Sequence, residues 1–376
     1  MPLSVHFGAI VPSSRWKRVR LSEVVTLQRG HDLPAQDRTS GPIPIIGSFG
    51  VTGSHNVARY PGPGVTIGRS GSIGNATYTA GPYWPLNTSL FVSDFRGNDP
   101  RWVYWLLHSI DFTAYNSGSV QPSLNRNFLT GIAVDLPPLD QQRRIAEVLG
   151  ACDDLIDSNK RTLQSTEALL QAHFEAMSFD SPGGVALADR VDLNPNYSKP
   201  KGIAPYVDMA ALPTDSFFIE EVSSRPAAGG ARFMRDDVLL ARITPCLENG
   251  KAAFAANLVP GEVYVGSTEF IVMRSKQGVS PSWPYFLARS ERFREYAIRH
   301  MTGSSGRQRL AATSLESYEV GGNSDALLEF DRLASTLLDA ASQLSTENAE
   351  LRRTRDELLP LLMSGAVRVR PEEVAA

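Results

Sequence analysis

The amino-acid sequence predicts an α+β protein built from two β-rich globular domains, each followed by a long helix. The two helices are expected to pack as an antiparallel coiled-coil spacer. Three observations predict this fold: a long hydrophobic seam over residues 140–180, a second over residues 325–366, and a sequence pattern that repeats in both halves of the chain. A pattern whose segments recur in the same order is the signature of a duplicated structural unit.

The first seam predicts a helix of unusual length. Pro137 and Pro138 suit a helix start, and Asp140 is expected to cap the first turn because its carboxylate accepts free backbone N–H groups. No Gly or Pro interrupts the chain between Gly150 and Pro182. The seam follows alternating four- and three-residue steps, which is the coiled-coil period. Its residues are Ile145, Leu149, Cys152, Ile156, Asn159, Leu163, Thr166, Leu170, His173 and Met177.

A second seam near the C-terminus supplies a partner with the same steps. Both seams carry polar residues at a few positions, which typically fix the register of a coiled coil. Two unrelated amphipathic helices on separate cores are the alternative interpretation. The residues of the second seam are Phe330, Leu333, Leu337, Ala340, Leu344, Glu347, Leu351, Thr354, Leu358 and Leu361.

The repeat links the two halves of the chain segment by segment. Gly303 lies 185 residues after Gly118, and Phe330 lies the same 185 residues after Ile145. We therefore expect a first domain at residues 1–139, a central spacer helix at 140–180, a second domain at 181–324, a C-terminal spacer helix at 325–366 and a tail at 367–376. The matching segments are 65–69 with 238–243, 88–92 with 267–272, 102–108 with 283–289, and 116–119 with 301–304.

Within the first domain, each expected element follows from its composition. Residues 16–28 mix basic and apolar side chains and predict a strand or a short helix. Residues 30–81 are rich in Gly, Pro, Ser and Thr with short β-type runs, which indicates twisted β structure with many turns. A turn and strand at 83–92, a short apolar helix at 101–109, a polar loop at 116–130 and a last strand at 132–136 complete the domain.

Composition sets limits on function. The chain has 376 residues, is 42% hydrophobic and 20% charged, and carries a net charge of −3, so any basic surface must be local. No apolar run has membrane-spanning length, and the N-terminus is a poor signal peptide. The two cysteines, Cys152 and Cys246, are expected to be reduced in a cytoplasmic protein. Neither they nor the six histidines show metal-ligand spacing, and no cofactor is expected.

Several motifs give the chain a family resemblance. It resembles the specificity subunits of Type I restriction-modification systems over nearly its whole length. The motifs are 68–74 (GRSGSIG), 87–90 (NTSL), 117–119 (SGS), 121–126 (QPSLNR), 136–139 (LPPL) and 141–146 (QQRRIA) in the first half, and 241–251 (ARITPCLENGK), 266–272 (GSTEFIV) and 358–365 (LLPLLMSG) in the second. The second half departs from the pattern where Gly322, Asn323 and Leu327 replace Pro137, Pro138 and Gln142.

The resemblance implies a non-catalytic, DNA-binding subunit. Each globular domain would be a target-recognition domain for one half of a split, asymmetric site in double-stranded DNA, and the helices would fix the distance between the halves. Two methyltransferase subunits would dock on the helices, and motor-nuclease subunits would join to form the restriction complex. Duplicated domains on a rigid spacer suit two half-sites, because geometry then sets their spacing.

The polar loops supply the candidate DNA-binding residues. Arginine and lysine neutralise phosphates or pair with guanine, asparagine and glutamine pair with adenine, and a glutamate can accept from a cytosine amine. Each such residue could instead stabilise a turn or face solvent, and 87–88 and 267–269 could be internal hydrogen-bonding strand ends. The candidates are Arg69, Ser70, Ser72, Asn87, Thr88, Ser117, Ser119, Gln121, Asn125, Arg126, Arg242, Thr244, Glu248, Asn249, Lys251, Thr268, Glu269, Ser304, Arg307, Gln308 and Arg309.

Catalytic and structural alternatives were weighed against this interpretation. Residues 194–197 (NPNY) resemble the Asn-Pro-Pro-Tyr motif of amino-methyltransferases but lack its second proline. The glycines of 47–53 do not lie between a clear strand and helix, and 248–251 (ENGK) lacks the further acidic residue of a metal-dependent nuclease. We interpret all three as non-catalytic. A non-catalytic coiled-coil scaffold with two protein-binding β-rich domains, or a fragment of a fused restriction-methylation enzyme, are the alternative functions.

Overall fold

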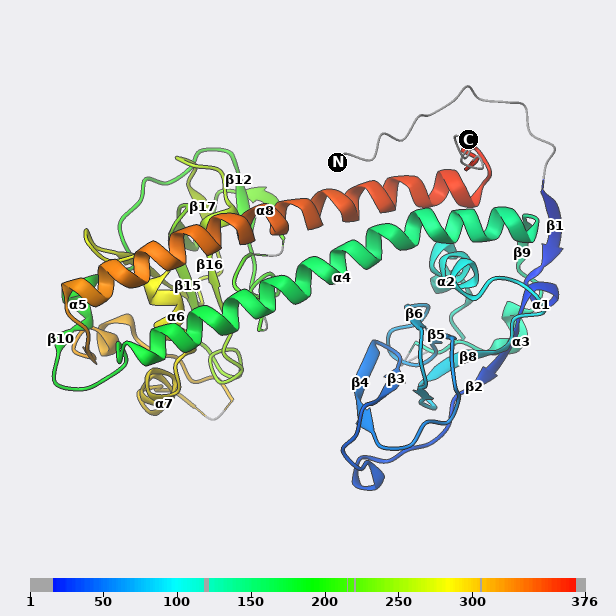
Figure 1. Ribbon diagram of the computed structural model, residues 1–376, viewed down its shortest axis with the longest axis horizontal. Helices are drawn as coiled ribbons and strands as arrows, with labels where there is room; N and C mark the ends of the chain where they lie inside the picture. The colour runs from blue at the N-terminus through cyan, green and yellow to red at the C-terminus, as the bar shows by residue number, and fades with distance from the viewer. Residues whose placement is uncertain (1–15, 118–121, 215, 220, 305, 370–376) are drawn as a thin grey trace, which may run out of the picture. The chain divides into compact units, whose positions relative to one another are not determined.

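A computed structural model describes residues 16–117, 122–214, 216–219, 221–304 and 306–369. The chain divides into two compact units, which we describe separately. Unit 1 comprises Met1–Asp154 and Leu351–Ala376, and unit 2 comprises Leu155–Glu350. Each unit contains a β-rich domain and one part of each of the two long helices (Figure 1).

Unit 1 contains three small sheets and a helix that covers one of them. The sheet orders are β2-β8-β5-β6, β4-β3-β7 and β1-β9. In the second sheet β3 pairs parallel with β7 and antiparallel with β4. The elements are β1 Lys17–Arg20, α1 Leu21–Val24, β2 Thr26–Arg29, η1 Ala35–Asp37, β3 Ile43–Gly47, β4 Gly50–His55, β5 Gly64–Gly68, β6 Ala76–Thr79, β7 Trp84–Pro85, β8 Ser89–Asp94, α2 Pro100–Ser109, η2 Phe112–Tyr115, α3 Arg126–Leu129 and β9 Ala133–Leu136.

Unit 2 repeats this arrangement. Its sheet orders are β11-β18-β15-β16, β13-β12-β17-β14 and β10-β19, and β12 again pairs parallel with β17. The one added strand is β14, at the edge of the second sheet. The elements are β10 Val185–Ala186, α5 Leu187–Arg190, β11 Val191–Leu193, β12 Ile203–Val207, β13 Ser223–Pro226, β14 Ala231–Phe233, β15 Val238–Ala241, β16 Ala252–Phe254, η3 Ala255–Asn257, β17 Tyr264–Gly266, β18 Phe270–Ser275, α6 Trp283–Arg289, α7 Glu291–Arg299, η4 Ala312–Leu315 and β19 Glu319–Val320.

The duplication predicted from the sequence is therefore a duplication of topology. The buried strand β5 corresponds to β15, β8 to β18, and the apolar helix α2 to α6. Both central strands are buried along their whole length. Their sequences are therefore mostly apolar throughout and do not alternate between apolar and polar residues. The segment predicted as the polar loop 116–130 also contains the short helix α3, which Asn125 caps by accepting from the Asn127 backbone N–H.

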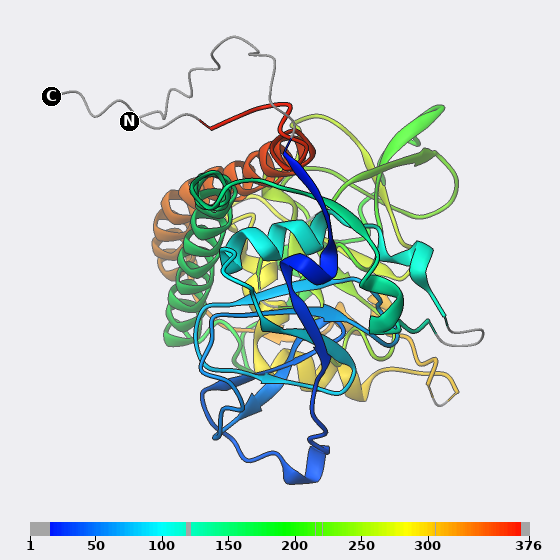
Figure 2. The same cartoon turned by 90° about the vertical axis from the view of Figure 1, so that its right-hand side faces the viewer.

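The two long helices are α4 (Leu139–Ala176) and α8 (Ser324–Met363), and within each unit their segments run side by side in antiparallel directions (Figures 1 and 2). In unit 1 the Arg355 guanidinium of α8 donates to Asp153 of α4 at 2.7 Å. In unit 2 the Asn159 side chain of α4 donates to Asn348 of α8 at 3.1 Å. The antiparallel packing predicted from the two seams is thus present in each unit.

Two details of the helix predictions were wrong. The first helix begins at Leu139, so Asp140 lies inside its first turn and forms an ion pair with Arg144 instead of capping the helix. The second seam buries Phe330 as predicted but is displaced by one residue after it, because α8 buries Ala334, Leu338 and Ala341 while the predicted Leu333 and Leu337 are only partly buried. This helix packs against both α4 and the domain core, so its buried stripe follows the position of the core as well as the coiled-coil period.

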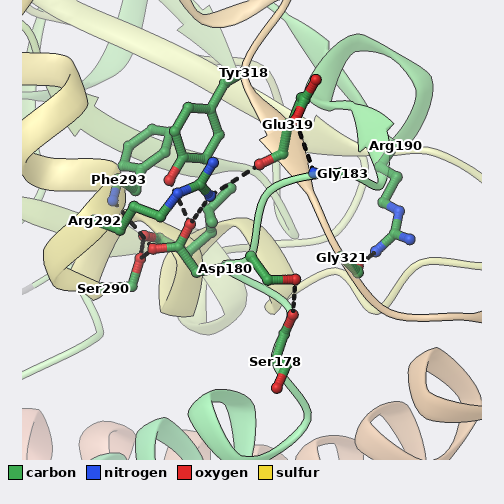
Figure 3. A network of polar contacts seen from close by, with 12 residues as sticks. Ser178, Asp180, Gly183, Arg190, Ser290, Arg292, Phe293, Tyr318, Glu319 and Gly321 are labelled. Carbon is green, nitrogen blue, oxygen red and sulfur yellow. Dashed lines mark hydrogen bonds and ion pairs between the residues drawn. The ribbon is translucent and has the colours of Figure 1, made fainter.

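A network of polar contacts around Asp180 fastens the end of α4 to the domain of unit 2 (Figure 3). Its carboxylate accepts from the Ser290 hydroxyl at 2.5 Å, from Arg292 at 2.8 Å and from the Phe293 backbone N–H at 3.1 Å, and also from the Tyr318 hydroxyl. The Asp180 side chain is only 9% exposed. A nearly buried carboxylate with four donors fixes the start of α7 and the path of the chain after α4.

Each unit has its own apolar core. In unit 1, Trp102 and Trp105 of α2 are fully buried against the sheet and against Leu149 of α4. In unit 2, Trp283 of α6 packs with Phe174 and Phe330 of the long helices. The two cysteines lie in different units and both are free thiols. Among the residues that the structure describes, no helix is long and apolar enough to cross a bilayer.

Candidate nucleic-acid interface

In unit 1, backbone hydrogen bonds bring three distant segments together at the end of strand β5. The Arg69 N–H donates to the Thr88 carbonyl at 2.9 Å, and the Arg69 carbonyl accepts from the Leu124 N–H at 2.8 Å. Ser70 pairs with Ser123 in an isolated antiparallel bridge. The loop residues 116–117 and 122–124, the strand end at 69–70 and the turn before β8 therefore form one polar surface.

Unit 2 has the same set of backbone hydrogen bonds between a strand end, the turn before the next strand and a polar loop. We call this set of bonds the polar frame. The Arg242 N–H donates to the Glu269 carbonyl at 2.9 Å, and the Arg242 carbonyl accepts from the Leu310 N–H at 2.8 Å. Ile243 pairs with Arg309, which in turn pairs with Thr302. Arg242 is thus the counterpart of Arg69, Glu269 of Thr88, and Arg309 of Ser123.

An open cavity of about 430 Å³ lies on this frame in unit 1. Arg29, Arg69 and Arg126 line it together with Asn125. The Arg69 guanidinium donates to the Asn87 carbonyl at 3.3 Å, and Arg29 lies 3.9 Å from the Asp32 carboxylate. Arg126 is exposed, so its charge is free to meet an anion. Three arginines around one polar hollow make a local positive surface on a chain whose net charge is negative.

A cavity of about 460 Å³ lies in unit 2 next to Arg242, and its lining includes β14, which has no equivalent in the described part of unit 1. Arg232, Arg242, Asn194 and Thr268 are among the residues that line it. The Arg242 Nε and the Thr244 hydroxyl are buried and have no hydrogen-bond partner within the described part of the chain. Buried polar atoms normally find a partner, so these two are exceptions within the described residues.

Arg309 and Glu269 form a two-pronged ion pair beside the cavity of unit 2. The Arg309 Nε lies 2.9 Å and its Nη2 lies 2.8 Å from the Glu269 carboxylate oxygens. These hydrogen bonds lower the pKa of Glu269, and the charges of Arg309 and Arg242 contribute in the same direction. The carboxylate therefore stays ionised through the neutral range.

The structure does not bring every predicted residue into these two surfaces. Lys251 donates through Nζ to the Met209 carbonyl at 2.9 Å, and the Glu248 carbonyl accepts from Arg294 at 2.8 Å, so the segment 248–251 is tied to other neighbours. Asn249 is exposed on the same turn. In unit 1, the Asn87 amide contacts the Asp32 carboxylate, and the Ser72 carbonyl packs against the Gly68 backbone.

The two polar loops hold the remaining candidates. The Ser117 hydroxyl donates to the Ser123 carbonyl at 2.9 Å, which stabilises the loop. Ser304 and Arg307 are exposed at the tip of the 302–309 loop, and the Gln308 carbonyl accepts from the Thr244 N–H at 3.1 Å. Ser119 and Gln121 lie outside the described residues.

Sequence reasoning missed Arg29 and Arg232, which line the two cavities. Arg29 ends β2 and faces Leu90 of β8 in the register, so its position follows from strand pairing between distant segments. Asn194 was considered only as part of a methyltransferase-like motif. Its side chain instead accepts from the Val272 N–H at 2.9 Å and extends the pairing of β11 with β18.

Within the part of the chain that the structure describes, no cluster of three or more His, Cys, Asp or Glu side chains has the arrangement of a metal site. Tyr197, in the motif considered above, donates its hydroxyl to the buried Asp237 at 3.1 Å. That contact gives the tyrosine a structural partner.

Comparison with known proteins supports the resemblance from two directions. Residues 13–168 match the family described as Type I restriction modification DNA specificity domain. The Type I restriction enzyme EcoprrI specificity subunit of Escherichia coli is 26% identical over 148 residues, which are 38% of this chain and 37% of the relative. The EcoEI specificity subunit of the same organism is 26% identical over 196 residues, which are 50% of this chain and 32% of the relative.

These alignments span only about a third of the length of the two curated relatives. The fold extends the similarity to nearly the whole chain. A crystal structure of the S subunit of a Type I restriction-modification system from M. genitalium superposes with a TM-score of 0.57 at 14% identity, covering 96% of this chain and 98% of that one. The resemblance to Type I specificity subunits is therefore confirmed, by sequence for residues 13–168 and by fold for almost all of the chain.

Proposed function

We propose that this chain is the DNA sequence-specificity subunit of a Type I restriction-modification complex. Each β-rich domain would read one half of a bipartite, asymmetric site in double-stranded DNA. The chain would do no chemistry itself; two methyltransferase subunits and motor-nuclease subunits would supply it. The single observation that carries this proposal is the twice-repeated polar frame, with Arg69 in unit 1 and Arg242 in unit 2 at equivalent strand ends.

The side chains on the two frames suit the two tasks of DNA recognition. Exposed arginines such as Arg126 and Arg307 can neutralise phosphates, which carry no sequence information. Asn125 accepts from a backbone N–H through its oxygen, which leaves its amide nitrogen available to a base edge. The exposed hydroxyl of Thr268 beside Arg242 is a further candidate for a base contact.

The antiparallel helix pair supports the proposed spacing role. Helices packed along a shared seam resist bending, so they suit a spacer that sets the distance between half-sites. The exposed faces of α4 and α8 would then dock the methyltransferase subunits. Leu155 and Leu169 of α4 and Leu328 of α8 are large apolar side chains on these outer faces.

The decisive experiment is methylome sequencing of cells that express the chain with its methyltransferase subunits. We expect methylation only at a split sequence with two specified halves. Arg69→Ala and Arg242→Ala should each weaken or relax a different half, by about 1–3 kcal/mol if a base contact is lost. Each variant is the control for the other.

Three results would contradict the proposal. Methylation without sequence preference, or failure of the chain to assemble with the methyltransferase subunits, would each exclude a specificity role. Equal losses at both halves in either variant would show that the arginine holds the fold. DNA affinity should also fall steeply with salt, since phosphate contacts release counterions; salt-insensitive behaviour without DNA binding would instead favour a protein-binding scaffold.

A further inference from the structure

The Glu269–Arg309 pair has no counterpart among the described residues of unit 1. At the equivalent positions unit 1 carries Thr88 and Ser123, which are uncharged. The pair also spans 40 residues of sequence, so it is formed by the fold and not by a local turn. An ion pair that is present in only one of the two duplicated frames can make the two domains recognise different bases.

The position of Arg309 is fixed at both its backbone and its side chain. Its N–H donates to the Thr302 carbonyl at 2.8 Å, and its carbonyl accepts from the Thr302 N–H at 3.0 Å. Its guanidinium is held through Nε and Nη2 by the Glu269 carboxylate. Glu269 is itself anchored, because its carbonyl accepts from the Arg242 N–H at 2.9 Å.

The ion pair occupies only one edge of the guanidinium. Arginine has five N–H donors in a rigid plane, and the carboxylate takes donors on the Nε and Nη2 side. Within the described residues Arg309 makes no other side-chain hydrogen bond, and its side chain is 48% exposed. The Nη1 group and the outer N–H of Nη2 therefore point away from the carboxylate as a free two-donor edge.

The charge of the pair favours a base over a phosphate. Glu269 neutralises Arg309 and would repel a phosphate brought against the same edge. The major-groove edge of guanine is uncharged and presents two acceptors, N7 and O6, which match two parallel N–H donors. A guanidinium that is already held in place loses less side-chain entropy when it binds.

From this geometry we propose that Arg309, held by Glu269, reads one guanine in the half-site recognised by unit 2. Glu269 is the positioning residue and Arg309 makes the base contact. This inference rests on the proposed function and adds a residue-level specificity to it. Unit 1, which has Thr88 and Ser123 at these positions, reads its half-site without such a pair.

The first test uses the wild-type complex and modified DNA. Once methylome sequencing gives the bipartite site, the half that Arg242→Ala weakens is assigned to unit 2. Each guanine of that half is replaced in turn by 7-deazaguanine, which lacks the N7 acceptor, or by hypoxanthine, which keeps N7 and O6. At one guanine we expect about a tenfold loss of affinity with 7-deazaguanine and near-normal binding with hypoxanthine.

The second test uses variants in the full complex. Arg309→Ala and Arg309→Lys should both relax that guanine position, because lysine keeps the charge but lacks the planar fork. They should also abolish the penalty of 7-deazaguanine. Glu269→Gln should lower affinity several-fold while guanine stays preferred, since the fork is less firmly held. Arg299→Ala, which removes an exposed arginine at the end of α7 in the same unit, is the matched control and should leave the preference unchanged.

The possible contradictions are separable from failure of the proposed function. A complex without any bipartite motif would refute the specificity role itself. A bipartite motif with no guanine in the unit 2 half, or with guanines insensitive to 7-deazaguanine, would overturn only the inference. So would an Arg309→Ala variant that binds all sequences more weakly with a salt slope reduced by about one, because that is the behaviour of a phosphate contact.

Discussion

Units 1 and 2 share a backbone frame but differ in the side chains that complete it. Three arginines line the unit 1 cavity, whereas unit 2 carries an ion pair, Arg309 with Glu269, at two positions that are uncharged in unit 1. The starts of the long helices differ as well. Gln142 of α4 is buried and bonds Asn98 and the Asp99 backbone, while the corresponding Leu327 of α8 packs into the apolar core.

This comparison shows why such a fold can be duplicated and then diverge. The bonds that assemble each polar surface run between backbone groups, so they do not depend on the identity of the side chains. Asn323 illustrates the same freedom at the start of α8. It caps the helix by accepting from the Ala326 N–H at 2.9 Å, where α4 begins after two prolines. Side chains on the frame can change without loss of the frame.

We expect the largest change in stability at Asp180, which fastens α4 to the domain of unit 2. Asp180→Ala removes an acceptor shared by Ser290, Arg292, Phe293 and Tyr318. Arg292 is 35% exposed and keeps the Glu319 carbonyl as an acceptor. The main loss is therefore the nearly buried acceptor of Phe293 and Tyr318, and the free energy of unfolding should fall by about 3 kcal/mol. Urea unfolding measures this loss, with the exposed Asp189→Ala as control. A loss below that of the control would show that the network is dispensable.

A smaller effect is expected at Gly68, whose counterpart in unit 2 is Ala241. A Cβ added at Gly68 would lie 1.8 Å from the Ser72 carbonyl oxygen and 2.5 Å from that of Ser48, both backbone atoms. Gly68→Ala should therefore cost about 2 kcal/mol and weaken reading of the unit 1 half-site. Ala241→Gly is the reciprocal control and should cost no more than about 1 kcal/mol. Unfolding curves and half-site affinities report both variants; equal costs would mean that the units tolerate the same residue.

A third difference between the units is a buried amide–amide hydrogen bond between the two long helices of unit 2. Unit 2 buries Asn159 against Asn348. In unit 1 the two helices instead pack through Ile145, Leu149 and Leu362, and their polar contact is the partly exposed ion pair of Arg355 with Asp153. Asn159→Leu should cost about 1–2 kcal/mol, because Asn348 loses its partner. Adding Asn348→Leu should restore stability, since no buried polar group is then unpaired. A double-mutant cycle by urea unfolding would detect additive losses, which would contradict coupling between the two asparagines.

We expect the smallest effect in the pH dependence of stability, because Glu269 can be protonated whereas Thr88, at the equivalent position in unit 1, cannot. The Arg309 hydrogen bonds depress the pKa of Glu269 in the folded protein below its ordinary value of 4.5. Stability from this pair is therefore present above pH 4.5 and is lost as the pH falls through the lower folded-state pKa. The difference in urea midpoint between the native chain and Glu269→Gln should shrink in that acidic range. A difference that stays constant from pH 7 to about pH 3 would mean that the ion pair adds nothing to folding.

Local patterns made much of the fold predictable. The three- and four-residue steps of the seams identified both long helices, and the apolar runs at 65–69 and 238–243 identified the buried central strands. The repeat in the sequence corresponds to the matching strand orders of the sheets in units 1 and 2. The displaced seam of α8 shows the limit of such patterns, because a helix that faces both a partner helix and a core does not follow the coiled-coil period alone.

The order of residues along the chain was enough to specify the two long helices, the duplication and the class of side chains available on the polar loops. Which of those side chains meet depended on how the strands pair in the folded protein. It joined Arg309 to Glu269, placed Arg29 beside Arg69 and Arg126, and tied Lys251 to Met209 instead. Periodicity is a property of near neighbours in the chain, whereas these contacts join residues some 40 or more positions apart and follow from strand order and backbone pairing.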